Sequence, residues 1–170
     1  MKKKIIPKKV LVVGGTGFIG KNFIKYLSNY KNYQILYTFR NSNIHIKKKN
    51  VKALKFNYFD NKNFNKIIKF NPDYLFLFAW SGIPNFTKKN SQLNYTSTIR
   101  FIKKIKKTLS LKSIIYTGTC WEILKTKQNK KNIFFVKSKI KIKNKLFKIF
   151  KKTSTNIIWT RLFYVYGEEQ

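Results

Sequence analysis

The chain has 170 residues, enough for one domain with a real core, and 43% of them are hydrophobic, which excludes a disordered chain. No apolar stretch is long enough to span a bilayer, and no signal-peptide core follows the basic start. Cys120 is the only cysteine, which excludes an internal disulfide, and its distance along the chain from the single histidine, His45, argues against a metal site. We therefore expect a cytoplasmic protein without a resident metal.

The formal net charge of +33 is extreme, with 38 lysines and arginines against five acidic residues. One interpretation is a nucleic-acid or anionic-membrane partner. The other is compositional drift in an AT-rich genome, because Lys, Asn, Ile, Phe and Tyr are all abundant and Ala and Gly are scarce. The lysines are spread along the chain, and no nucleic-acid-binding motif is present, so drift is favoured. We expect no specific nucleic-acid partner, only loose and salt-sensitive binding to polyanions.

The hydrophobic periodicity predicts strands and helices in strict alternation. Residues 9–13 form a strand and 17–29 a helix; then come strands at 33–39 and 51–56, a helix at 61–70, a strand at 74–79, a helix at 89–107, a strand at 112–117, a helix at 135–152 and a strand at 156–161. This order predicts an α/β fold, a doubly wound parallel sheet with helices on both faces, in one domain over residues 1–170. The continuous apolar run at 74–79 indicates a central strand.

The most informative segment is the first strand and the glycines that follow it. Val10–Val13 is apolar throughout, and Gly14, Gly17 and Gly20 lead into the first helix. Gly14 allows the tight turn, Gly17 lets backbone approach a pyrophosphate, and Gly20 lets the helix pack close to the strand. Strand, glycine turn and helix in this order predict a dinucleotide site, with the anion at the helix N-terminus. The alternative is a tight turn that binds nothing.

Four further segments support this interpretation and appear in a recognisable order. They are Asn71–Ala79 at the central strand, Leu93–Thr96 in the long helix, Tyr116–Glu122 at the fifth strand and Arg161–Gly167 at the sixth. Together with residues 14–20 they resemble the motifs of the extended short-chain dehydrogenase/reductases, the NAD-dependent epimerase/dehydratases of nucleotide sugars. Trp80 stands where that family has the second alanine of its central-strand motif. The resemblance implies a Rossmann-type fold.

The resemblance also implies a cofactor, NAD or NADP, and the residues that bind it. Arg40 ends the second strand with no acid beside it, which favours NADP over NAD, because an arginine suits the 2′-phosphate. The alternative is an ordinary surface arginine. The implied cofactor residues are Gly14, Thr16, Gly17, Phe18, Ile19, Gly20, Arg40, Asn57, Tyr58, Phe78, Ala79, Trp80, Asn94, Thr117, Lys139 and Phe163.

The catalytic residues that the resemblance implies are incomplete. The family uses a hydroxyl, a tyrosine and a lysine four residues later to support hydride transfer at a sugar carbon. Thr119 and Lys139 match the hydroxyl and the lysine, but Phe135 stands at the tyrosine position and cannot exchange a proton. Glu122 either contacts substrate or pairs with a lysine. Cys120 is expected to line the site without acting as a nucleophile.

Family members also continue through another strand and a C-terminal segment that builds the sugar-nucleotide pocket. We therefore expect the fold to lack most of the C-terminal substrate-binding segment, to leave apolar sheet surface uncovered and to form a homodimer or aggregate. Three functions stay open. The chain acts on a nucleoside-diphosphate sugar in surface polysaccharide biosynthesis, or it binds cofactor without catalysis as a remnant or partner subunit, or it is a basic nucleic-acid-associated protein.

Overall fold

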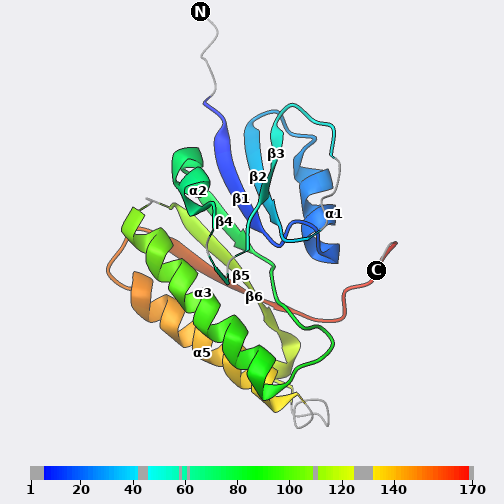
Figure 1. The fold of residues 1–170 in the computed structure, drawn as a ribbon, viewed down its shortest axis with the longest axis vertical. Coiled ribbons are helices and arrows are strands. Elements are labelled where there is room, and N and C mark those ends of the chain that lie inside the picture. Colours follow the sequence, from blue (N-terminus) through cyan, green and yellow to red (C-terminus); the bar gives the residue numbers. More distant parts are fainter. Residues whose placement is uncertain are drawn as a thin grey trace, which may run out of the picture.

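The structure is a computed structural model that describes residues 6–41, 46–57, 59–60, 62–108, 111–124 and 132–168. Within them six strands form one parallel sheet in the order β3-β2-β1-β4-β5-β6 (Figure 1). The strands are β1 (Lys8–Val13), β2 (Tyr33–Phe39), β3 (Val51–Lys55), β4 (Tyr74–Leu77), β5 (Ser113–Thr119) and β6 (Asn156–Leu162). The helices are α1 (Phe18–Leu27), α2 (Phe64–Phe70), α3 (Lys88–Thr108) and α5 (Ile133–Phe150), with the short 3-10 turn η1 (Cys120–Glu122).

This architecture confirms the predicted doubly wound parallel sheet, and β4 lies between β1 and β5 as its apolar run indicates. The predicted bounds shift where local contacts override periodicity. The strand expected at 74–79 ends at Leu77, because the N–H groups of Phe78 and Ala79 both donate to the Val13 carbonyl. The helix expected at 61–70 starts at Phe64, after Asn63 in the left-handed region (φ 64°). The turn η1 was not predicted.

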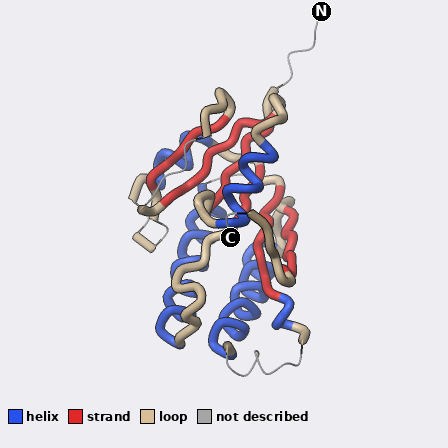
Figure 2. The backbone as a smooth tube through the Cα atoms, turned by 90° about the vertical axis from the view of Figure 1, so that its right-hand side faces the viewer, coloured by secondary structure: helices blue, strands red, loops and turns tan. Residues whose placement is uncertain are grey.

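The two faces of the sheet are covered by different helices. On one face α1 packs on β1 and β2, through Val10, Val12, Ile24 and Tyr37 among others. On the other face lie α2, α3 and α5, and the two long helices α3 and α5 run side by side in both views (Figure 2). Alternate residues of β1 therefore enter different cores, as a strand buried on both faces requires.

On the face of the sheet that α1 packs against, the described helices cover only some of the strands. Val12 of β1 aligns with Phe76, Ile115 and Ile158 across β4, β5 and β6, so these side chains point to the α1 face. Ile158 is 47% exposed there. Within the described residues, apolar sheet surface is thus open over β6. Among the described residues no helix combines the length and apolarity needed to cross a lipid bilayer.

Candidate functional site

The turn after β1 is tightly held and needs glycine at specific positions. Gly14 has φ +87°, and a Cβ atom there would lie 2.6 Å from the backbone nitrogen of Ala79. A Cβ atom on Gly20 would collide with the Gly14 carbonyl oxygen, so this glycine sets how closely α1 packs on the turn. From β2, Thr38 accepts the N–H groups of Gly14 and Gly15 at 3.3 and 3.0 Å. The turn is fixed in place before any ligand arrives.

The N-terminus of α1 is open to a ligand. Gly17 is the N-cap residue, and no side chain caps this helix within the described part of the chain. The nearest atom to a Cβ on Gly17 would be the Gly14 oxygen at 3.6 Å, an ordinary contact, so the space beside Gly17 is free. The first N–H groups of a helix have no intrahelical acceptor and carry the positive end of the helix dipole. This geometry suits an anion such as a pyrophosphate.

A cavity of about 550 Å³ opens beside this turn, at the carboxyl ends of β1, β2, β3 and β4. Most of the residues predicted to bind cofactor line it: Gly14, Thr16, Gly17, Phe18, Ile19, Gly20, Arg40, Asn57, Phe78, Ala79 and Trp80. The cavity also has lining residues that were not predicted, namely Val13, Thr38, Phe39, Phe56, Phe59, Ser81, Ile83 and Val165. Tyr58, another predicted cofactor residue, lies outside the described residues, and so does His45.

Arg40 reaches across the mouth of this cavity. Its Nη1 donates to Oγ of Ser81, 3.2 Å away, and the side chain is exposed. Asn57 is partly committed to its own loop, since its Oδ1 accepts the N–H of Phe59 at 3.2 Å and its Nδ2 donates to Asp60 at 3.4 Å. Among the described residues that line the cavity, Arg40 is the one cationic side chain, and none is a carboxylate.

The remaining predicted cofactor residues do not line the cavity. Asn94 is fully buried and holds the loop after β4: its Oδ1 accepts the N–H of Ser81, and its Nδ2 donates to the Ser81 carbonyl, both at 2.9 Å. Thr117 donates to the Leu77 carbonyl at 3.2 Å, and Phe163 is exposed. Ser81, which sequence reasoning missed, links Asn94 to Arg40. The sequence feature that could have pointed to Ser81 is a small polar residue just beyond the carboxyl end of a central strand.

Phe135 and Lys139 of α5 lie together beside the carboxyl end of β5, where Thr119 caps the start of η1. Lys139 is 4% exposed, and its Nζ donates to the Thr117 carbonyl at 2.6 Å. The same Nζ lies 4.5 Å from the ring centre of Trp80, 4.9 Å from that of Tyr116 and 5.6 Å from that of Phe135. Burial lowers the pKa of Lys139 to about 7, although the charge of Glu122 opposes this shift.

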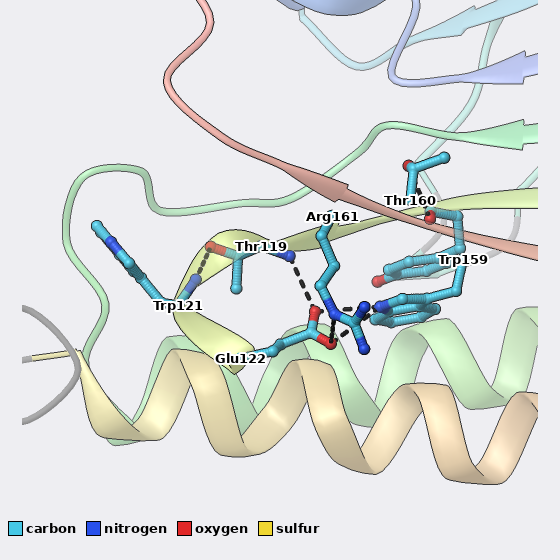
Figure 3. A network of polar contacts seen from close by, with 7 residues as sticks. Thr119, Trp121, Glu122, Trp159, Thr160 and Arg161 are labelled. Atoms are coloured by element: carbon cyan, nitrogen blue, oxygen red, sulfur yellow. Dashed lines mark hydrogen bonds and ion pairs between the residues drawn. The ribbon is translucent and has the colours of Figure 1, made fainter. Parts of the chain in front are cut away.

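Both carboxylate oxygens of Glu122 are engaged in contacts with neighbouring side chains and backbone (Figure 3). It accepts the N–H of Thr119 at 2.9 Å and the indole N–H of Trp159 at 3.0 Å, and it forms an ion pair with Arg161 at 3.6 Å. Its side chain is only 3% exposed. Of the two interpretations of Glu122, pairing is the one that the structure shows, with an arginine in place of the expected lysine.

Comparison with models of known protein families shows which family the chain belongs to. The model of the NAD dependent epimerase/dehydratase family matches residues 10–170. The chain belongs to this family. No curated protein sequence matches it.

Solved structures of epimerases share the fold of this family member. An epimerase from Methanothermobacter thermautotrophicus is 19% identical with a TM-score of 0.74, covering 96% of this chain and 53% of its own. The UDP-glucuronic acid 4-epimerase of Bacillus cereus, in complex with UDP-glucuronic acid and NAD, is 17% identical with a TM-score of 0.77, covering 95% and 58%. A variant of that enzyme with one tyrosine replaced by phenylalanine, also in complex with NAD, is 18% identical with a TM-score of 0.75, covering 95% and 58%.

This epimerase/dehydratase family chain spans just over half the length of these relatives. Within its described residues no three His, Cys, Asp or Glu side chains gather as metal ligands would. Cys120 is a free, buried cysteine next to Thr119, and His45 lies outside the described residues. The site thus presents backbone amides and a cation that suit an anion, together with a separate buried lysine.

Proposed function

We propose that this protein binds NAD or NADP in the cavity beside the glycine turn, with the pyrophosphate at the N-terminus of α1. The observation that carries the proposal is the free space beside Gly17, in front of a helix terminus that no described side chain caps. Membership of a family whose structurally similar members include NAD complexes supports the choice of ligand. The cofactor residues that line the cavity are those named above.

Titration with NADPH, NADP⁺ and NAD⁺ tests this proposal directly. Isothermal calorimetry should give dissociation constants in the micromolar range, about −8 kcal/mol, for at least one of these ligands. Absence of binding by all three at any concentration would end the dinucleotide proposal.

Arg40 is the residue that we propose discriminates between the two cofactors. The guanidinium stands at the end of β2, where an arginine accommodates the 2′-phosphate of NADP, and the described residues that line the cavity include no carboxylate to bind the 2′-hydroxyl of NAD. NADP is therefore modestly favoured. In an Arg40→Ala variant we expect NADP⁺ affinity to fall about tenfold and NAD⁺ affinity to change less than about twofold. Equal losses for both ligands would contradict this role.

For the reaction, we propose that efficient turnover is absent because Phe135 supplies no proton. Thr119 would hold the sugar oxygen and Lys139 would orient the ribose, as the family resemblance implies, but loss of a general acid/base costs about 10²–10⁴ in rate. Phe135 is 7% exposed and in van der Waals contact with other rings, which favours a cofactor-binding protein over an enzyme. If activity survives, its substrate is a nucleoside-diphosphate sugar.

The variant Phe135→Tyr separates these two functions. With NAD(P) and a panel of nucleoside-diphosphate sugars, a restored phenol that produces epimerase or reductase turnover would show that the rest of the site is intact. If Phe135→Tyr stays inactive while still binding cofactor, the missing phenol is not the sole cause of the lost turnover. Phe134→Tyr, one residue earlier on the exposed side of α5, is the matched control.

A further inference from the structure

The cavity and the residues expected to do chemistry are separated by one side chain. The cavity lining runs from the glycine turn across the ends of β2 and β3 to Trp80, Ser81 and Ile83. Neither Thr119 nor Lys139 belongs to that lining, although both lie at the end of the neighbouring strand β5 or against it. Trp80 takes part in both environments, since it lines the cavity and its ring also covers the Lys139 ammonium at 4.5 Å.

Four aromatic side chains, which we call the aromatic plug, pack together next to Lys139. They are Trp80 after β4, Phe86 before α3, Trp121 in η1 and Phe135 in α5. The Phe135 ring is the centre: it lies 4.9 Å from Trp80 at 89°, 4.5 Å from Phe86 at 36° and 6.0 Å from Trp121 at 82°. These centroid distances and angles are those of packed aromatic pairs, so no ligand-sized gap separates the rings.

Doubly wound sheets of this order bind a dinucleotide as two mononucleotides, one on each half, with the pyrophosphate between them. Here the half formed by β1, β2 and β3 is open and carries Arg40 and the glycine turn. The half formed by β4, β5 and β6 is occupied by the aromatic plug and by the enclosed Lys139. A nicotinamide ring beside the Lys139 ammonium would have to displace the Trp80 and Phe135 rings, which already pack against it.

We propose that the site recognises the ADP portion of its ligand and leaves the nicotinamide outside the closed half, so that any adenosine 5′-diphosphate with a small substituent binds equally well. This inference rests on the proposed nucleotide function and narrows it to an adenine-nucleotide site. Trp80 is the residue that sets this specificity. It stands where the resemblance places an alanine, which would leave the passage from the cavity to Lys139 open.

The comparison of NAD⁺ with ADP-ribose, which differ only by the nicotinamide, tests the inference. By calorimetry on the full chain, we expect their dissociation constants to agree within about twofold, whereas a ring of this size in a fitted pocket adds about tenfold or more. NAD⁺ binding ten times tighter than ADP-ribose would overturn the inference and leave the dinucleotide proposal standing. Failure of ADP, ADP-ribose and NAD⁺ alike to bind would overturn both.

Opening the plug should restore discrimination. In Trp80→Ala we expect the ratio of NAD⁺ affinity to ADP-ribose affinity to rise at least about fivefold. Phe86→Ala, which thins the plug at a partly exposed position, provides a second variant if Trp80→Ala does not fold. Phe134→Ala on the exposed side of α5 is the control and should change neither affinity. An unchanged NAD⁺ to ADP-ribose ratio in both folded plug variants would contradict the role of the plug.

Discussion

At the residue scale, Gly17 and Gly20 of the same turn differ in the space available for a side chain. Gly17 has an extended φ of −73° and open space beside it, so alanine fits the fold but projects a methyl group into the place proposed for the pyrophosphate. At Gly20 a methyl group meets the Gly14 carbonyl oxygen and the Gly15 Cα, both backbone atoms that cannot move aside cheaply. The first glycine therefore serves ligand binding and the second serves packing.

We predict that Gly17→Ala lowers NAD(P) affinity at least about tenfold while changing the free energy of unfolding by less than about 1 kcal/mol. Gly20→Ala should instead cost roughly 1–3 kcal/mol of stability through overpacking. Thermal unfolding and calorimetric titration of both variants measure the two effects. Wild-type affinity in a folded Gly17→Ala protein would place the phosphates elsewhere.

Lys139 makes stability depend on pH in a direction opposite to that of a paired lysine. Burial lowers its folded-state pKa to about 7, below the unfolded value of about 10.4. Between these values the unfolded chain binds more protons than the folded one at this site, so stability rises as pH increases from about 7 to about 10.4 and is lost as pH falls through about 7. The limiting slope for one such group is about 1.4 kcal/mol per pH unit.

We predict that Lys139→Met removes this contribution, because methionine fills a similar space without a charge to desolvate. Urea unfolding of the two proteins at pH 6.5, 8 and 9.5 should give stabilities that converge as pH rises, with the variant more stable at the lowest pH. Lys137→Met, on the exposed side of the same helix, corrects for the general loss of one positive charge. A difference between wild type and Lys139→Met that does not vary with pH would show that the ammonium is not desolvated.

The sequence motif located the cavity because glycine positions dictate backbone conformation locally. The positions of Gly14, Gly17 and Gly20 therefore carry over directly to the turn. The separation of Lys139 from the cavity was not predictable in this way, because it depends on rings from four segments far apart in the chain. The sequence shows that Phe135 stands where the resemblance implies a tyrosine, but it does not show that the Phe135 ring lies at the centre of an aromatic cluster.

At the scale of elements, Asp73 lies just before β4 and links β1, β4 and β5 at the amino ends of these strands, opposite the cavity. Its Oδ2 accepts the N–H of Lys9 on β1 at 2.8 Å, and its Oδ1 pairs with Lys112, just before β5, at 2.9 Å. Its backbone N–H donates to the Lys9 carbonyl at 2.8 Å. Burial raises the pKa of Asp73, but the Lys9 N–H and the Lys112 ammonium together hold it below its usual value.

We predict that Asp73→Ala lowers the free energy of unfolding by about 1–3 kcal/mol, because the partly buried amide of Lys9 loses its acceptor. Lys112→Met should cost less than about 1 kcal/mol, since the Lys112 side chain is 63% exposed and its ion pair is solvated. Because the folded pKa is depressed, the contribution of Asp73 should be present above about pH 4 and disappear as pH falls further. Urea unfolding at pH 7 and pH 3 measures each variant. Equal losses in both would mean that the ion pair, and not the amide, holds the strands.

Element order and type were predictable because strict alternation of apolar strands and amphipathic helices leaves few topologies. The ends of β4 and β5 were not, because they are decided by hydrogen bonds across the sheet. The N–H groups of Phe78 and Ala79 both donate to the Val13 carbonyl, and β4 ends before them at Leu77. By contrast, β5 continues to Thr119 because β6 pairs with it as far as Leu162. Ladder partners of this kind are absent from the hydrophobic pattern of a single segment.

At the scale of the whole molecule, two opposing forces act on association. A net charge of +33 makes copies of the chain repel each other at low ionic strength and weakens the compact state through self-repulsion. The apolar face over β6, with Ile158 exposed, favours burial against another surface. Because salt shortens the Debye length to about 3 Å at 1 M but leaves apolar contacts intact, added salt shifts the balance toward association. The same screening should abolish the loose polyanion binding expected from the charge.

We therefore predict that raising NaCl from 0.02 to about 1 M increases both the melting temperature and the apparent mass in light scattering, because self-repulsion is screened over that range. Ile158→Glu should reduce the salt-induced association, since it places a charge in the apolar face, while keeping the rise in melting temperature. Ile140→Glu makes the same change of charge on the surface of α5 and should associate like the original chain. A clean monomer at high protein concentration and high salt would show that the β6 face is too small to drive assembly. Loss of association in both variants would mean that the β6 face is not the surface through which the chains associate.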